Sequence, residues 1–183
     1  NDNMLELGSG SALLKEFILN KNFKTSDLTN YDFIDYKNLD ATNTNLQSQS
    51  FSVIISSNLI HHVAYPLKLF EEVLRLLKPG GLYIIQDVNC SLIFKIIILL
   101  MRIEGYDFTS DVLNKNVPCN DHRDPFSGNN AIPNLIFDNF DKFNAKLNNR
   151  FEITFSKHNE FLSFINSGGI IAKTFYIPLN DFL

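Results

Sequence analysis

Residues 4–12 read Met4-Leu5-Glu6-Leu7-Gly8-Ser9-Gly10-Ser11-Ala12, and this stretch decides the fold. Its first four residues form a short apolar run, which predicts a strand, and the glycines that follow predict a tight turn. The next apolar residues recur at helical spacing and predict a helix: Leu13, Leu14, Phe17 and Ile18. A strand, a glycine turn and a helix in this order open an α/β sheet.

The same alternation continues along the chain. Strands are predicted at residues 23–26, 33–39, 51–55 and 82–86, and a helix begins at Pro66 and is stopped by Lys78-Pro79-Gly80-Gly81. Residues 92–103 predict an apolar helix, residues 114–133 a long polar loop, and residues 151–155 and 170–177 further strands. We expect one domain over residues 1–183 with a mostly parallel sheet. Because the chain enters a strand almost at once, we also expect that an N-terminal segment is missing.

The glycine turn can serve two kinds of cofactor. A dinucleotide-binding loop needs glycines at its first, third and sixth positions, but here these positions are Gly8, Gly10 and Leu13. Glu6 would repel a pyrophosphate, whereas it suits the ammonium and sulfonium charges of S-adenosylmethionine. Gly8 and Gly10 would let the backbone approach that ligand closely. The alternative is that the glycines only make a turn.

Two more carboxylates follow predicted strands. Asp27 comes after residues 23–26 and could accept both ribose hydroxyls of the cofactor. Asp40, followed by the small Ala41, could accept a hydrogen bond from the adenine amino group. Each could instead be a turn residue or a helix cap. Because the carboxyl ends of parallel strands meet at one edge, we expect Asp27 and Asp40 to lie near Glu6.

Residues 4–87 resemble the class I S-adenosylmethionine-dependent methyltransferases, in the branch related to small-molecule enzymes. The resemblance rests on four motifs: Glu6-Leu7-Gly8-Ser9-Gly10, Leu39-Asp40-Ala41, Phe51-Ser52-Val53-Ile54-Ile55-Ser56-Ser57-Asn58-Leu59-Ile60-His61-His62, and Val73-Leu74-Arg75-Leu76-Leu77-Lys78-Pro79-Gly80-Gly81. Asp124 to Pro133 and Ser167-Gly168-Gly169 are similar to a sub-branch associated with bacterial surface-polysaccharide gene clusters.

This resemblance implies a Rossmann-like α/β fold. Its sheet would have seven strands, parallel except for one antiparallel strand near the C-terminus, with helices on both faces. The implied cofactor contacts are Glu6, Gly8, Ser9, Gly10, Asp27, Leu28, Asp40, Ala41, Asn58 and Leu59. The chain departs from the family at Ala12, where many members have glycine. It also leaves too few residues between Asp27 and the third predicted strand for a crossover helix.

Catalytic and acceptor residues are predicted from position. His61 and His62 follow the strand at residues 51–55, and a neutral imidazole could remove a proton from an acceptor; both could instead be structural. His122 and Arg123 lie in the polar loop and could bind a polar acceptor, or could simply be solvated. Cys119 and His122 alone do not define a metal site, so we expect no metal.

Composition limits the function classes. The formal net charge is −4 and no basic cluster stands out, so we expect no nucleic-acid partner. Only two cysteines occur, which favours a reducing, cytoplasmic location. The apolar helix at residues 92–103 is too short and too charged to span a membrane, but it could touch a membrane surface.

The combined prediction is an enzyme that moves a methyl group from S-adenosylmethionine to a small-molecule, glycan or lipid-linked acceptor, leaving S-adenosylhomocysteine. One alternative is a non-catalytic module that only binds the cofactor. Another is a nicotinamide-dependent oxidoreductase, which Glu6 and Leu13 disfavour.

Overall fold

The computed structural model describes residues 2–101, 104–124 and 126–158. Contacts between backbone positions divide the chain into two compact units, Asn1–Phe151 and Glu152–Leu183. Every helix and strand described below belongs to the first unit, and residues 152–158 contain neither. The single domain over residues 1–183 stays a prediction.

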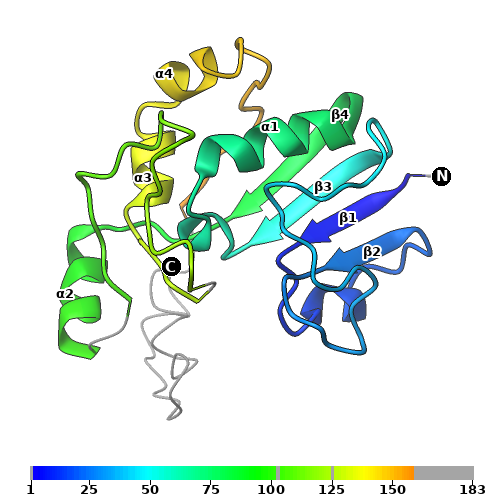
Figure 1. The fold of residues 1–183 in the computed structure, drawn as a ribbon, viewed down its shortest axis with the longest axis horizontal. Coiled ribbons are helices and arrows are strands. Elements are labelled where there is room, and N and C mark those ends of the chain that lie inside the picture. Colours follow the sequence, from blue (N-terminus) through cyan, green and yellow to red (C-terminus); the bar gives the residue numbers. More distant parts are fainter. Residues whose placement is uncertain (1, 102–103, 125, 159–183) are drawn as a thin grey trace. The chain divides into compact units, whose positions relative to one another are not determined.

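A parallel sheet forms the centre of the first unit (Figure 1). It contains β1 (Met4–Leu7), β2 (Phe23–Ser26), β3 (Phe51–Ser57) and β4 (Leu77–Gln86), in the order β2-β1-β3-β4. All three neighbouring pairs are parallel. The carboxyl ends of the four strands therefore lie at one edge of the sheet, as in other open α/β folds. This confirms the prediction of a parallel, Rossmann-like sheet.

Helix α1 (Pro66–Leu76) covers one face of this sheet. Proline occupies its first turn, where a missing N–H costs nothing, and the helix ends as Leu77 turns extended. Leu69, Phe70 and Val73 are at most 1% exposed. Burial of each such side chain contributes about 1.5–3 kcal/mol to folding. The Phe70 ring also meets the Tyr83 ring of β4 edge to face, at 5.6 Å between centroids.

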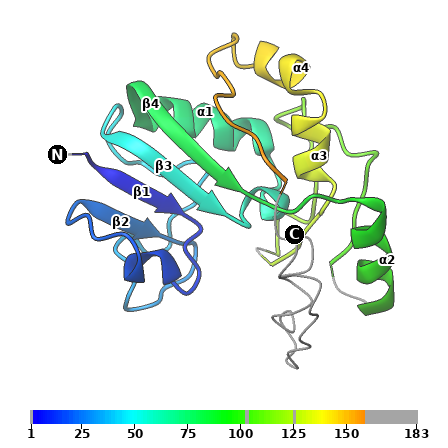
Figure 2. The ribbon, with the colours of Figure 1, turned by 180° about the vertical axis from the view of Figure 1, so that it is seen from behind.

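The opposite face of the sheet is less covered. On β4, the side chains of Leu82 and Ile84 are 44% and 43% exposed. Figure 2 shows this side of the molecule, with the strands in front of α1. Within the described residues, the prediction of helices on both faces is therefore confirmed only for the face that α1 covers.

The helix predicted after the glycine turn is wrong in length. Only one 3-10 turn forms, η1 (Leu13–Glu16), and Phe17 and Leu19 are 70% and 92% exposed. Ala12 adopts a left-handed conformation with φ 56°, which turns the chain where a regular helix would have to start. A single turn without a buried apolar face does not propagate, because most helical stability comes from packing.

The prediction of a seven-stranded sheet is also wrong for the described part of the chain, which has four strands and no antiparallel pair. Residues 33–39 contribute only an isolated bridge between Ser26 and Tyr36. The connection from Asp27 is too short for a crossover. Instead, Asp35 accepts a 3.0 Å hydrogen bond from the Thr25 backbone, where a third strand would pair. Residues 151–155 form no strand, and residues 170–177 lie outside the described residues.

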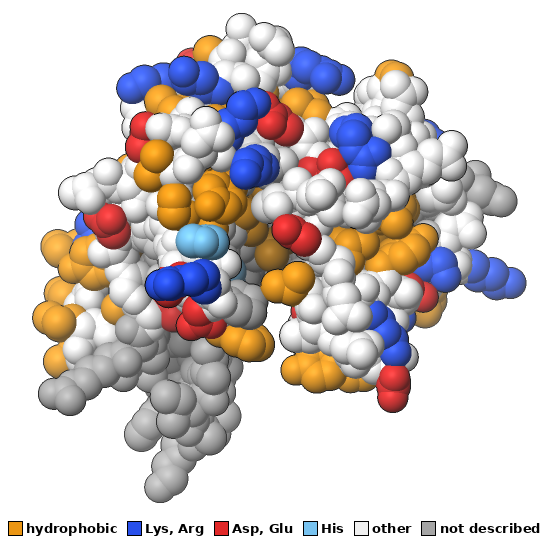
Figure 3. All heavy atoms as spheres, in the orientation of Figure 1, with side chains coloured by type: hydrophobic (Ala, Val, Ile, Leu, Met, Phe, Trp, Pro, Cys, Tyr) orange, Lys and Arg blue, Asp and Glu red, His pale blue; other side chains and the backbone are white. Residues whose placement is uncertain are grey.

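Three helices follow the sheet: α2 (Leu92–Met101), α3 (Ile132–Phe137) and α4 (Phe140–Ala145). Helix α2 exposes an apolar face that includes Leu92, Ile96 and Leu99, and Figure 3 shows such side chains gathered along the left edge, over α2. None of the helices described here has the length and hydropathy that a membrane span requires.

Candidate functional site

The glycine turn after β1 is shaped by backbone geometry. Gly8 has φ +67°, and a Cβ at this position would lie 2.7 Å from Cδ1 of Leu59. Gly8 therefore meets both conditions that favour glycine, a left-handed backbone and a close neighbour. Gly10 has φ +50°, and a Cβ there would meet no atom within 4 Å, so this side of the turn is open. The Leu59 side chain therefore leaves room only for a glycine at position 8, at the ends of the paired strands β1 and β3.

Glu6 is the most unusual residue of the turn, because its carboxylate is buried and one of its oxygens has no hydrogen-bond partner in the described part of the chain. The residue is 3% exposed, and its Oε2 atom has no hydrogen-bond partner among the described residues. Burial raises the pKa of Glu6, and the negative charge of Asp27 adds to this effect, although a hydrogen bond with Ser9 opposes both. An unpaired buried carboxylate is costly unless a cation or a hydrogen-bond donor binds to it.

Asp27 ties the turn to the end of β2. Its Oδ2 atom accepts a 2.8 Å hydrogen bond from the Gly10 amide, and its Oδ1 atom accepts bonds from the amide and hydroxyl of Thr29 at 2.9 and 2.7 Å. The neighbouring Leu28 is 49% exposed. A carboxylate has about four acceptor positions, so Asp27 keeps limited capacity for a ligand. The structure thus brings together Glu6, Gly8, Ser9, Gly10 and Asp27, as predicted.

Asp40 and Ala41 lie close to Asp27 in the folded chain. The Leu39 amide donates a 2.9 Å hydrogen bond to the Asp27 carbonyl, which places Asp40 one residue from that contact. The Asp40 side chain itself accepts two 2.8 Å bonds from Thr42, an Asx turn. It also borders a groove of about 680 Å³ beside α1. Contact with an adenine stays a prediction for Asp40.

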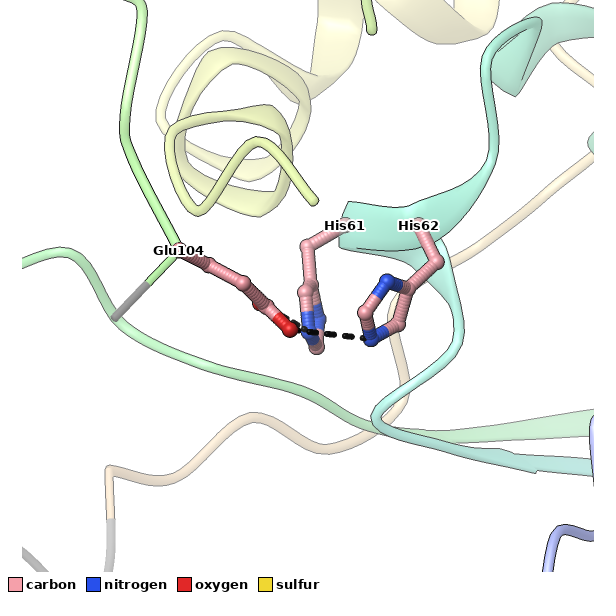
Figure 4. Close-up of side chains that lie close together, drawn as sticks. All are labelled: His61, His62 and Glu104. Carbon is pink, nitrogen blue, oxygen red and sulfur yellow. Dashed lines mark ion pairs between the residues drawn. The ribbon is translucent and has the colours of Figure 1, made fainter. Parts of the chain in front are cut away.

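A second cluster lies beyond β3, in the 3-10 turn η2 (Ile60–His62). The His61 Nδ1 atom lies 2.5 Å from Asp87 Oδ1, and both side chains are at most 5% exposed. Glu104, in the loop after α2, lies on the other side of the His61 ring. Its Oε2 atom is 3.5 Å from His61 Nε2, and its Oε1 atom is 3.8 Å from His62 Nε2. Figure 4 shows the carboxylate of Glu104 pointing toward the two imidazoles.

The electrostatics of this cluster favour a charged His61. Burial alone would lower the pKa of His61, but the hydrogen bonds and charges of Asp87 and Glu104 outweigh it and raise the pKa to about 9. The hydrogen bond with His61 in turn lowers the pKa of Glu104. The sequence predicted the two histidines but missed Glu104. The only signal was an acidic residue directly after the apolar helix.

The polar loop is built onto η2. The Asn129 amide donates a 2.8 Å hydrogen bond to the His61 carbonyl, and the Asn120 side chain donates one of 2.8 Å to the His62 carbonyl. His122 and Arg123 both lie exposed in this loop. Arg123 pairs with Asp121, and the His122 ring lies 6.3 Å from the Tyr65 ring. Nothing in the described structure joins either side chain to Glu104, so their acceptor role stays a prediction.

A protein-family model described as "Methyltransferase domain" matches residues 5–85 of this chain. These residues contain the glycine turn, Asp27, Asp40 and both histidines. Over these residues the chain is therefore similar to a methyltransferase domain. The match ends one residue before the end of β4, and Asp87 and Glu104 follow it.

Curated relatives match part of this chain. Two strains of Cereibacter sphaeroides have a "Ubiquinone biosynthesis O-methyltransferase" that is 36% and 38% identical over 56 residues. Each match covers 31% of this chain and 23% of the relative. The chain is therefore aligned with less than a quarter of these relatives' length.

Solved structures of other proteins also resemble part of this chain. The CurJ carbon methyltransferase has 23% sequence identity and a TM-score of 0.42, over 49% of this chain and 30% of that one. A putative sarcosine dimethylglycine methyltransferase from Galdieria sulphuraria has 22% identity and a TM-score of 0.42, over 55% of this chain and 46% of that one.

Proposed function

We propose that this chain transfers a methyl group from S-adenosylmethionine to a small-molecule, glycan or lipid-linked acceptor. The observation that carries the proposal is the buried, unpaired Oε2 atom of Glu6 beside the glycine turn of the methyltransferase domain. The cofactor has an ammonium group and a sulfonium group, and either charge would compensate this carboxylate. A pyrophosphate would instead be repelled, which argues against a nicotinamide cofactor.

Each group of residues at the carboxyl edge of the sheet has a distinct role in this proposal. Gly8, Ser9 and Gly10 let the backbone approach the cofactor, while Asp27, followed by Leu28, accepts hydrogen bonds from the ribose. Asn58 and Leu59 line the methionine end, because Leu59 already contacts Gly8. Asp40 and Ala41 face the adenine. The bound cofactor supplies a methyl group on a positively charged sulfur, which is ready for displacement.

Methyl transfer needs an acceptor atom held in line with that methyl group, and positioning supplies much of the acceleration. The loop bonded to η2 would form the acceptor side, with His122 and Arg123 at its surface. A hydroxyl acceptor must also lose a proton. Because its pKa is raised, His61 is protonated near neutral pH, so it is suited to orienting the acceptor and stabilising negative charge on it. His62, whose side chain is 27% exposed, is better placed to meet an acceptor proton.

The acceptor class is part of the proposal. Two relatives are named for ubiquinone biosynthesis, which is said of those proteins, and an O-methyl transfer to a hydroxyl is the corresponding reaction here. The apolar face of α2 would suit an acceptor with a lipid tail, or contact with a membrane surface. The similarity of residues 124–133 to the surface-polysaccharide sub-branch favours a glycan head group. Both described cysteines are free, which fits a cytoplasmic enzyme.

Calorimetry with S-adenosylhomocysteine and with NAD tests the cofactor class. We expect saturable binding of S-adenosylhomocysteine and none of NAD. Binding of NAD alone would contradict the proposal and favour an oxidoreductase. A screen for methyl transfer to nucleotide sugars and lipid-linked glycans then tests turnover. Binding of the cofactor without turnover on any acceptor would favour a non-catalytic module.

A further inference from the structure

The two histidines of η2 both use their Nδ1 atoms for structural contacts. His61 Nδ1 lies 2.5 Å from the Asp87 carboxylate, and His62 Nδ1 lies 3.2 Å from the Ser127 carbonyl oxygen. Both partners are acceptors, so each Nδ1 atom carries a hydrogen. A metal ion that displaces the second proton of a charged His61 would therefore bind at Nε2, and the same atom of His62 presents its lone pair when that imidazole is neutral.

These two Nε2 atoms converge on a third Lewis base. The Glu104 oxygens lie 3.5 Å from His61 Nε2 and 3.8 Å from His62 Nε2, and one ligand atom from each of the three residues lies within 4.8 Å of the other two. The interaction of Glu104 with His61 is thus a long hydrogen bond, beyond the roughly 2.7–3.2 Å of a well-formed one, and the separation from His62 is longer still. One proton can bridge only one imidazole–carboxylate pair, whereas one cation can contact all three groups.

The separations match those of ligands around a metal ion. Zinc binds imidazole nitrogen at about 2.0–2.1 Å and carboxylate oxygen at about 2.0–2.2 Å, in tetrahedral geometry. Neighbouring ligand atoms around such an ion are therefore about 3.3–3.5 Å apart. The 3.5 Å separation between His61 Nε2 and Glu104 Oε2 already has this value. The remaining ligand atoms lie within 4.8 Å of one another, so the His62 and Glu104 side chains would have to move closer to bind the same ion.

The surroundings support this arrangement. A Cβ at Gly128 would lie 2.5 Å from Glu104 Oε2 and 2.8 Å from its Cδ, so glycine at this position makes room for the carboxylate. Asp87 also accepts a 2.7 Å bond from the Ile60 amide and a 2.8 Å bond from the Val88 amide. A carboxylate fixed in this way and bonded to Nδ1 of a histidine is the usual outer partner of a metal-binding imidazole.

The geometry points to a divalent-metal site whose ligands are Nε2 of His61, Nε2 of His62 and a carboxylate oxygen of Glu104. Two imidazoles and one carboxylate select a first-row transition ion such as Zn²⁺ over Mg²⁺. The side chains of His62 and Glu104 are each 27% exposed, which leaves a route for the ion and a fourth position for another ligand.

This site deepens the proposed function, on which its role rests. With the metal bound, both ring nitrogens of His62 are occupied, so the metal ion would take over the role given to His62 above. Its fourth position would bind the acceptor hydroxyl and lower its pKa, and the proton would leave to solvent, because a bound metal ion stabilises the oxyanion. The expectation of no metal rested on Cys119 and His122 alone. Glu104 cannot be placed beside the histidines from sequence, because a long segment of chain separates them.

The test measures metal binding directly on the full chain. After treatment with a chelator and dialysis, the protein is titrated with Zn²⁺ and Mg²⁺ by calorimetry, and Co²⁺ is added as an absorption probe. We expect one Zn²⁺ per chain, visible d–d bands for Co²⁺ and no measurable Mg²⁺ binding. Glu104→Gln and His62→Gln should each weaken Zn²⁺ binding at least tenfold, and Asp87→Asn should weaken it about 10–100-fold.

Glu71→Gln and His122→Gln are the matched controls, because both positions are exposed and lie outside the cluster. They should leave Zn²⁺ binding unchanged. Equal Zn²⁺ affinity in the wild type and in a folded Glu104→Gln variant would overturn the site, as would equal binding of Mg²⁺. Titration of the same samples with S-adenosylhomocysteine separates the two proposals: a chain that binds this ligand but no Zn²⁺ lacks the metal site, while the cofactor proposal stands.

Discussion

The amide nitrogen of Gly10 donates a 2.8 Å hydrogen bond to Oδ2 of Asp27, and this bond fastens the glycine turn to the end of β2. The carboxylate that we propose as the acceptor of the ribose hydroxyls thus also holds the loop that we propose to contact the cofactor. Binding and loop geometry depend on the same side chain, so its replacement should affect both.

Replacement of Asp27 by alanine removes both effects at once. We expect Asp27→Ala to weaken binding of S-adenosylhomocysteine by about 1–3 kcal/mol, the cost of losing a hydrogen bond to a charged group. Calorimetry measures the change. Asp32→Ala is the control, because Asp32 is an exposed carboxylate that pairs only with Lys37 in the described contacts. Unchanged affinity in a folded Asp27→Ala protein would remove Asp27 from the site.

Replacement of Gly8 tests the shape of the turn. Gly8→Val adds side-chain atoms where a Cβ alone would lie 2.7 Å from Leu59 and where φ is +67°. We expect loss of S-adenosylhomocysteine binding with a nearly unchanged circular dichroism spectrum. The left-handed strain should also lower stability by about 1–2 kcal/mol. Gly105→Ala is the control, because a Cβ there meets nothing within 4 Å. Normal binding by Gly8→Val would show that the turn is only structural.

Replacement of Glu6 by glutamine separates ligand binding from stability. The amide keeps the shape but loses the charge, so we expect affinity for S-adenosylhomocysteine to fall at least tenfold, about 1.4 kcal/mol. Because burial raises the pKa of Glu6, the folded protein holds this charge at a cost, and Glu6→Gln should keep or raise the melting temperature. A variant that binds normally but melts earlier would contradict the role of Glu6 as a partner of the cofactor charge.

Acid stability should depend on Glu72. Hydrogen bonds from Arg75 and from Thr44 lower the pKa of Glu72 to about 2, although burial opposes them. A carboxylate with a lowered folded pKa stabilises the protein above its unfolded pKa of about 4.3, and this stability is lost as pH falls toward 2. The free energy of unfolding in urea should differ by about 1–2 kcal/mol between the wild type and Glu72→Gln at pH 7, and the difference should shrink below pH 5.

Glu71→Gln is the control, because the partner of Glu71 is the exposed Lys115. This variant should change stability by less than about 0.5 kcal/mol at any pH. A constant difference across pH would contradict the assignment.

Loop order should depend on Asn129, which is 4% exposed. Its side chain accepts a 2.8 Å bond from the Asp107 amide and donates bonds to the Asp107 and Cys119 carbonyls at 3.1 Å. Asn129→Ala leaves these groups unpaired, so we expect faster proteolysis within residues 104–131 while the sheet stays intact. Limited proteolysis with mass spectrometry locates the cuts. The exposed Asn116→Ala is the control, and equal cleavage in both variants would contradict this role.

Local sequence patterns predicted much of the fold. The β-branched run of β3, the proline at the start of α1 and the glycines after β1 each depend on neighbouring residues, and each prediction is confirmed. The prediction of a helix at residues 13–18 was wrong for a different reason. Its apolar spacing was correct, but helix length depends on a surface to pack against, and Phe17 and Leu19 remain largely exposed.

The arrangement of the candidate site residues could be predicted only in part, for the same reason. Glu6, Gly8 and Gly10 lie in one short motif, and Asp27 follows from the alignment of parallel strand ends. Glu104 could not be predicted, because its contact with His61 depends on how the chain returns after α2. The role of Gly128, which leaves space for the Glu104 carboxylate, is apparent only from the folded structure.

Asp87 has a further consequence for the histidine cluster. It follows Gln86, which is paired with Ser57 of β3, and its carboxylate reaches both Ile60 and His61. Side chains along a strand alternate between the two faces, so a one-residue slip of β4 against β3 would turn this carboxylate away from His61. The cluster therefore depends on strand register. A single-residue deletion between Leu82 and Gln86 should dismantle it without touching any residue of the cluster.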